Sequence, residues 1–168
     1  MKQSDSDINL PIIGSAELIT ISGVHDVPAK IDTGADTSAI WASDINMDQD
    51  GRLSFTLFGP TSPLYTGKRL TTTDYRAKRV RSSNGDRQIR YRVKLPVTIK
   101  GESFETTFTL ANRSRNLFPI LIGRHTIEDR YLVDVSQSAV PRKKPVKSTE
   151  LTRELRKSPY EFHQKYID

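Results

Sequence analysis

Short apolar segments separated by turn residues recur along most of this chain, and they restrict its fold more than any other feature. Gly59-Pro60 and Lys100-Gly101-Glu102 are typical signals that stop or reverse an extended chain. Only Arg124–Arg130 has the pattern of a short helix in this region. The expected strands are 17–22, 27–31, 53–58, 95–99, 104–110, 118–122 and 131–135. Many short strands with regular turn signals predict an all-β barrel or sandwich.

A basic hairpin is expected between Lys78 and Lys94. The Ser82-Ser83-Asn84-Gly85 segment supplies the turn, because Asn-Gly tolerates the positive φ angles of tight hairpins. After it, apolar and basic residues alternate, with Arg90, Arg92 and Lys94 on one face. Like charges on one face repel each other, so an acidic partner is a reasonable hypothesis beside simple solvation.

The excess positive charge is uneven and marks a division of the chain. Of a formal net charge of +6, residues 140–168 carry +4 and residues 1–139 carry +2. The prolines around Arg142-Lys143-Lys144 prevent a helix or central strand there, so we expect a folded domain over 1–139. Residues 140–168 form a basic C-terminal tail with room for a short helix at 148–157.

Composition excludes several classes of protein. There is no cysteine, so disulfides, thiolate nucleophiles and Cys-ligated zinc are excluded. No apolar run approaches the roughly 18 residues that a membrane helix needs. The amino end lacks the pattern of a secretory signal, so the expected location is cytoplasmic.

One segment has the pattern of a catalytic loop. The common metalloprotease, serine hydrolase and dinucleotide motifs are absent, and the three histidines are scattered, so neither a metal site nor a cofactor is expected. By contrast, Asp32-Thr33-Gly34-Ala35-Asp36 follows an apolar strand and places a carboxylate in a turn of small residues. A second apolar strand runs into Gly123-Arg124 about 90 residues later.

These two elements, with a glycine-tipped hairpin between them, resemble the retropepsin-like aspartic proteases. Further segments, among them 80–85, 108–114, 121–124 and 132–135, resemble one prokaryotic family known as ATP-dependent zinc proteases, whose sequences are retropepsin-like. The zinc of that name has no ligand cluster here, and no ATP-binding loop is present. The resemblance implies a closed β-barrel of six to seven strands with one short helix.

The resemblance also implies an aspartic-type endopeptidase. Asp32, Thr33 and Gly34 would be catalytic, and since one Asp-Thr-Gly occurs, the second carboxylate would come from another copy in a homodimer. Gly123 and Arg124 would support the loop, with Arg124 in a partly buried ion pair with Asp36. The substrate-binding set would be Ala35, Asp36, Ser83, Asn84, Gly85, Arg90 and Arg92.

Acidic or glutamate-tailed peptides are the expected substrates, because relatives of this family lie beside ligases that add glutamate to proteins. A second interpretation stays open, in which a catalytically silent barrel binds acidic peptides through the basic hairpin. Nucleic acid is a weaker alternative partner, because only Tyr91 offers a stacking ring among the hairpin's charges. No membrane partner is expected.

Overall fold

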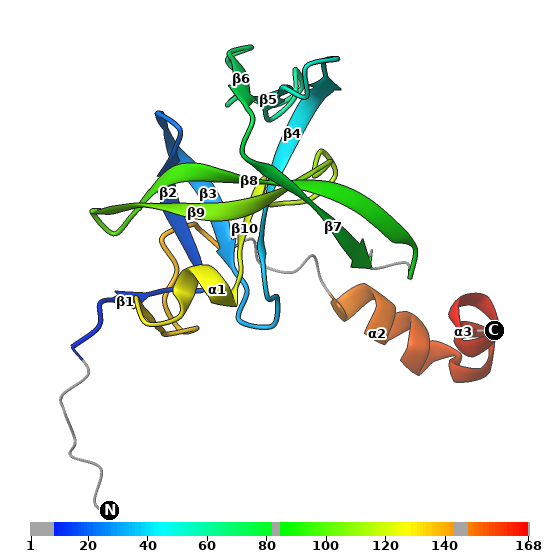
Figure 1. Ribbon diagram of the computed structural model, residues 1–168. Helices are drawn as coiled ribbons and strands as arrows, with labels where there is room; N and C mark the ends of the chain where they lie inside the picture. The colour runs from blue at the N-terminus through cyan, green and yellow to red at the C-terminus, as the bar shows by residue number, and fades with distance from the viewer. Residues whose placement is uncertain (1–8, 82–84, 143–147, 168) are drawn as a thin grey trace, which may run out of the picture.

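The computed structural model describes residues 9–81, 85–142 and 148–167, and most of its regular structure is β (Figure 1). The strands are β1 (Ile12–Ile13), β2 (Ala16–Ile21), β3 (Val24–Ile31), β4 (Ser38–Met47), β5 (Leu53–Leu57), β6 (Arg69–Thr72), β7 (Tyr75–Arg81), β8 (Arg87–Ile99), β9 (Glu102–Ala111), β10 (Ile120–Ile122) and β11 (Leu132–Val133). The helices are α1 (Arg124–Ile127), α2 (Ser148–Lys157) and α3 (Pro159–Tyr166).

Six strands of the described chain close into a barrel in the order β10-β3-β2-β8-β9-β4, and β4 pairs back onto β10. Closure depends on β10, which runs parallel to β3 and antiparallel to β4. The expected all-β, closed retropepsin-like barrel is therefore confirmed. Its interior holds mainly branched aliphatic and phenylalanine side chains: Ile19, Ile21, Val27, Ile40, Val93, Leu95, Val97, Phe108, Leu110, Ile120 and Ile122.

The long β8–β9 hairpin forms one wall of the barrel. Lys100 and Gly101 both have positive φ angles, of 52° and 79°, which suits the tight turn expected between the two strands. Along β8, Val93, Leu95, Val97 and Ile99 alternate with exposed or half-buried residues. This alternation directs one face to the core and leaves the other for solvent or ligand.

The β7–β8 hairpin extends beyond this wall. The two strands pair antiparallel from Tyr75↔Val93 to Arg81↔Arg87, as expected for the basic hairpin. Near the hairpin's end Ile89 is 67% exposed, although it lies on the apolar face of the strand. The hairpin around Ile89 therefore stands free of the core.

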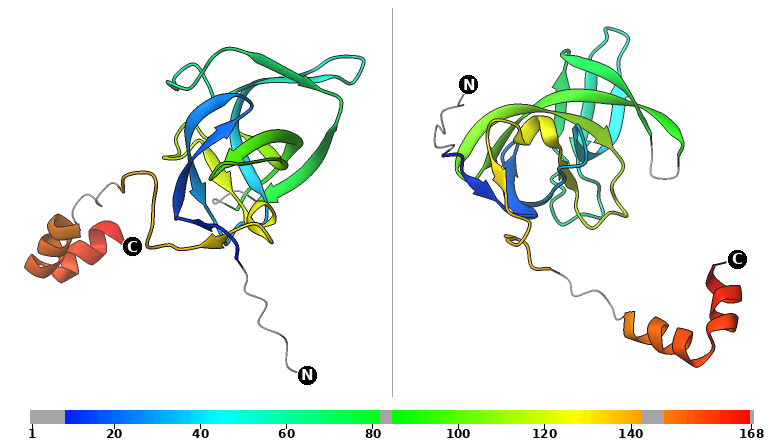
Figure 2. Two further views of the ribbon diagram at one scale, coloured as in Figure 1. Left: turned by 90° about the vertical axis from the view of Figure 1, so that its left-hand side faces the viewer. Right: turned by 90° about the horizontal axis from the view of Figure 1, so that it is seen from below.

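Some elements differ from the expected ones. Helix α1 ends at Ile127 rather than Arg130, and β4 occupies a segment for which no strand was expected. Beyond the barrel, α2 covers the expected helical residues, but α3 follows it as a second helix that packs on α2 (Figure 2). In the part of the chain that is described, no helix is both long and apolar enough to cross a membrane.

Candidate active site

Asp32 lies at the first position after β3, at the start of the loop that leads to β4. Its backbone N–H donates a hydrogen bond to the carbonyl of Ile122 at 2.9 Å, which fixes the loop to the end of β10. The N–H of Gly34 donates to Asp32 Oδ1 at 3.0 Å and sets the direction of the carboxylate. Asp32 is half-buried, whereas Thr33 and Gly34 are exposed. The loop thus holds a carboxylate in place and leaves it accessible.

Gly123 is required by the close contact between this loop and the turn after β10. A Cβ atom at this position would lie 2.6 Å from the carbonyl carbon of Thr37 and 2.9 Å from the carbonyl oxygen of Ala35. The next residue, Arg124, donates its backbone N–H to that same Ala35 oxygen at 2.7 Å. Any side chain larger than hydrogen would therefore separate two loops that brace each other. This is the supporting position expected for Gly123.

A buried set of hydroxyl groups fixes the same junction, and nothing in the sequence pattern had indicated it. Ser38 Oγ accepts the Gly123 N–H at 3.1 Å and shares a hydrogen bond with Thr126 Oγ1 at 2.7 Å. Thr126 Oγ1 also lies 2.9 Å from Thr106 Oγ1 on β9. These bonds connect β4, β9 and α1 behind the Asp32 loop and restrict its movement.

Asp36 and Arg124 form the expected ion pair, but the expectation that it is partly buried is wrong. The Arg124 side chain donates to Asp36 Oδ1, and the two side chains are 58% and 59% exposed in the single chain. The hydrogen bond from Arg124, followed by the guanidinium charge, lowers the pKa of Asp36 below its ordinary value of 3.8. Neither partner is enclosed, because α1 is a single turn at the barrel's end.

Replacing Arg124 with alanine is expected to lower the melting temperature of the single, undimerised chain only slightly at neutral pH, because solvent screens an exposed pair. A lowered pKa means that the pair stabilises the fold above the ordinary Asp36 value of 3.8 and loses that effect as pH falls through the lower, folded value. Calorimetry should compare the wild type with the Arg124→Ala variant at neutral pH and at a pH well below 3.8. The small difference in melting temperature should disappear in acid. A large difference that persists in acid would contradict this account.

The basic face of the β7–β8 hairpin approaches the Asp32 loop. Lys78 Nζ donates to Thr37 Oγ1 at 3.1 Å, and Arg90 is the cross-strand neighbour of Lys78. Because cross-strand neighbours share a face, Arg90 lies on the same side of the hairpin as Lys78. Arg90 also donates to Gln88 Oε1 at 2.9 Å, and partial burial lowers its pKa.

Arg113 belongs to the same region and was not among the expected site residues. It follows β9, is half-buried, and donates from Nε to the Phe118 carbonyl at 3.1 Å. Burial lowers the pKa of Arg113, the positive charge of Arg90 lowers it further, and the negative charge of Asp32 acts in the opposite direction. The charges of Arg90 and Asp32 therefore both act on Arg113. In the sequence, the one signal that could have indicated Arg113 is its place in the segment 108–114, which resembles the prokaryotic family.

The structure says less about the remaining residues that were expected to bind substrate. Ser83 and Asn84 lie outside the described residues, while Gly85 has a φ of 84°, as a tight turn needs. Ala35 is half-buried and contacts the turn after β10 through its carbonyl. Arg92 lies farther from the hairpin's end than Arg90 and lines two outer cavities. Within the described ranges, no group of three or more His, Cys, Asp or Glu side chains could hold a metal ion.

Curated relatives match part of this chain at moderate identity. Proteins named "Probable alpha-L-glutamate ligase" from Shewanella pealeana and Shewanella halifaxensis are each 31% identical over 132 residues, which is 76% of this chain. A protein of the same name from Desulfotalea psychrophila is 30% identical over 134 residues. The match covers 29% of each of these proteins, so the chain spans less than a third of their length.

A solved structure and a family model agree with the fold. The crystal structure of a protein of unknown function from Legionella pneumophila superposes with a TM-score of 0.59 at 27% identity and covers 76% of this chain and 95% of that one. The model of the RimB-like family, described as "Retropepsin-like aspartic endopeptidase RimB", matches residues 12–144; the name ATP-dependent zinc protease does not occur in these matches. The chain therefore belongs to the RimB-like family of retropepsin-like aspartic endopeptidases.

Proposed function

We propose that this protein is an aspartic peptidase that uses Asp32 from each of two copies. The observation that carries the proposal is the Asp32 loop itself, in which a half-buried carboxylate is oriented by the Gly34 N–H at 3.0 Å and flanked by exposed residues. Within the described chain, no hydrogen bond joins Asp32 to another carboxylate. A dyad would thus need the Asp32 of a second copy.

In such a dyad the two carboxylates share one proton, because like charges about 3 Å apart do not both ionise. The ionised carboxylate takes a proton from water as the water oxygen attacks the scissile carbonyl carbon. The protonated carboxylate donates a hydrogen bond to the carbonyl oxygen, and the tetrahedral intermediate collapses as the amide nitrogen receives a proton. The carbon–nitrogen bond breaks without any metal or cofactor in these steps.

The surface around the loop supports the proposed homodimer. A hollow of about 390 Å³ is lined by Thr33, Arg124, His125, Ile127 and Glu128, directly beside Asp32. The small β1–β11 sheet lies at the same end of the barrel as α1 and the β3–β4 loop, at the bottom of Figure 1. It exposes the apolar side chains of Ile12 and Leu132, and Val135, which follows β11, is exposed as well. Exposed apolar side chains beside a site that holds one of two carboxylates fit a contact between two copies related by a twofold axis.

Acidic peptides are the proposed substrates. Lys78, Arg90 and Arg113 place three positive charges around the approach to Asp32. The names of the curated relatives concern attachment of glutamate, and this chain resembles a part of those proteins. Together these observations favour a glutamate-rich segment as the chain that is cleaved. A cytoplasmic location stays a prediction.

The purified full chain is expected to cleave a glutamate-rich peptide faster than a neutral peptide of equal length, as measured by mass spectrometry of the products. The preference should fall as salt rises, because a Debye length of about 8 Å at physiological ionic strength screens surface charge. A chelator should not change the rate. Binding of the acidic peptide without any cleavage would instead favour the silent-barrel alternative, and loss of activity with the chelator would contradict the metal-free mechanism.

A further inference from the structure

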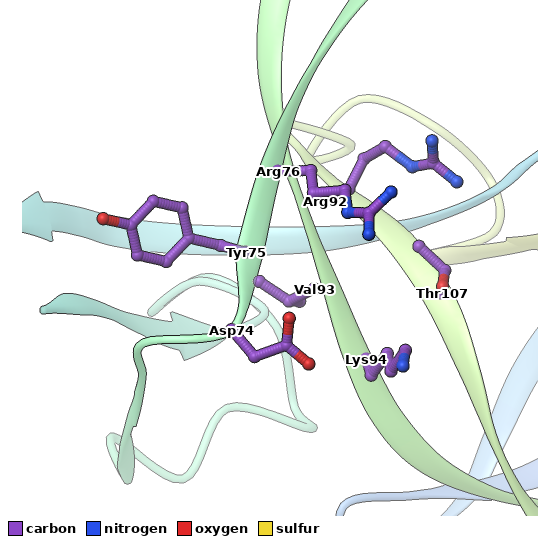
Figure 3. Close-up of a pocket in the computed structure, with 7 residues that line it drawn as sticks. All are labelled: Asp74, Tyr75, Arg76, Arg92, Val93, Lys94 and Thr107. Atoms are coloured by element: carbon purple, nitrogen blue, oxygen red, sulfur yellow. The ribbon is translucent and has the colours of Figure 1, made fainter.

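A row of positive side chains continues along the outer face of the barrel wall, away from the hairpin's end. Arg76 on β7 is the cross-strand neighbour of Arg92 on β8, and Lys94 on β8 is the neighbour of Thr107 on β9. Figure 3 shows the Arg76 and Arg92 side chains extending on the side of β8 toward Thr107. Three strands thus bring two guanidinium groups, one ammonium group and one hydroxyl group to the same area.

Two neighbouring cavities open on this area. The first has a volume of about 220 Å³ and is lined by Asp74, Tyr75, Arg76, Arg92, Val93, Lys94 and Thr107. The second, of about 250 Å³, shares Arg92, Lys94 and Thr107 with it and continues to Thr37 and Ser38 behind the Asp32 loop. Arg92 therefore lies between two hollows, each large enough for a small anionic group, and the second is also lined by the carboxylate of Glu105 and the guanidinium of Arg130.

The charges of this area lack partners within the protein. Among the described residues, the side chains of Arg76, Arg92 and Lys94 form no hydrogen bond or ion pair, and the Nε atom of Arg92 is buried without a hydrogen-bond partner. Asp74 contributes one carboxylate to the lining of the first cavity, so positive charge remains in excess there. A buried donor without a protein partner is costly, and a ligand group, an ion or an ordered water can satisfy it.

We propose that Arg76, Arg92, Lys94 and Thr107 form a binding site for an oxyanion, either a carboxylate or a phosphate group, outside the region above Asp32. The planar guanidinium of Arg92 can donate from Nε and one Nη to two oxygens of such a group. Arg76 and Lys94 supply the remaining positive charge, and the Thr107 hydroxyl supplies a neutral donor. The site does not depend on the chemistry proposed for Asp32.

The test is a titration of the full-length, ¹⁵N-labelled protein, followed by NMR at the Arg92 side-chain Nε–H and the Thr107 amide. One arm uses inorganic phosphate and the other uses a hexaglutamate peptide. At least one probe should shift both signals. The double variant Arg76→Gln with Arg92→Gln should bind that probe about tenfold more weakly or worse, judged at Thr107, because bonds to a charged group are lost.

The matched control is Arg79→Gln, which removes one positive charge from β7 at the position opposite Ile89, on the other face of the hairpin. It should leave the titration unchanged. A shift with hexaglutamate identifies a carboxylate ligand, and a shift with phosphate alone identifies a phosphate-bearing ligand. If neither probe shifts the Arg92 signal at millimolar concentration, or if the double variant binds equally well, the site does not exist.

Folding of the variant can be checked in the same samples. Because Arg92→Gln removes a guanidinium whose Nε is buried without a partner, the double variant should melt no lower than the wild type. Lys94 is exposed, so the variant Lys94→Gln does not affect the core. This second variant should also weaken binding of the probe. Retained binding in Lys94→Gln together with an unshifted Arg92 Nε–H would overturn the proposal.

Discussion

Replacing Asp32 with asparagine is expected to lower the rate of peptide cleavage by about 10³-fold or more while leaving the melting temperature unchanged. An amide has the shape of the carboxyl group but neither takes nor supplies a proton at neutral pH, and positioned acid–base groups contribute roughly 10²–10⁴-fold. The amide oxygen can still accept the Gly34 N–H, which lies 3.0 Å from Oδ1 in the native loop. Single-turnover cleavage of the glutamate-rich peptide measures the loss.

Asp26→Asn is the matched control for this substitution. Asp26 is an exposed carboxylate on β3 with a φ of 54°, a conformation that asparagine also tolerates, and it has no place in the candidate site. The Asp26→Asn protein should cleave the peptide at the rate of the wild type. Activity that survived Asp32→Asn would place the catalytic group elsewhere.

The second large effect is expected from the hairpin charges nearest the loop. Combining Lys78→Met with Arg90→Gln should reduce kcat/KM for a glutamate-rich peptide about 10- to 100-fold at low salt, because two contacts to charged groups are lost. A neutral peptide should be cleaved at an unchanged rate. Steady-state kinetics on the two peptides, in low and high salt, separate a loss of recognition from a loss of catalysis.

Arg79→Gln again provides the control, because it removes the same charge from β7 on the face opposite to Lys78 and Arg90. Its preference for the acidic peptide should match that of the wild type. Equal losses in this control and in the double variant would show that the net charge of the protein, rather than the face near Thr37, attracts acidic peptides.

Most strands of the barrel could be predicted from local patterns, whereas its closure is implied by the resemblance to the retropepsin-like proteases. The alternation from Val93 to Ile99 and the Lys100-Gly101 turn predict the β8–β9 hairpin directly, since both are properties of neighbouring residues. Strand β4 could not be predicted in this way. It begins with the small residues Ser38 and Ala39, whose strand propensity is weak, and it is extended because it pairs with both β9 and β10.

The candidate site, too, could be predicted from the sequence only in part. The Asp32 loop and Gly123 could be expected, because each lies in a short segment that resembles the retropepsin-like proteases. The exposure of the Asp36–Arg124 pair depends on how little of the protein covers α1, which no local pattern encodes. Arg113 reaches the region of Asp32 and Arg90 only because closure of the barrel brings the end of β9 to the loop after β3.

Mixing wild-type subunits with an excess of Asp32→Asn subunits tests most directly whether two copies share one active site. After exchange, the activity per wild-type subunit should fall toward the wild-type fraction of the mixture, because a dimer with one asparagine lacks half of its dyad. The same excess of the Asp26→Asn protein should leave that activity unchanged. A wild-type activity that is unaffected by the Asp32→Asn subunits, although mass measurements show that mixed dimers form, would contradict a shared dyad.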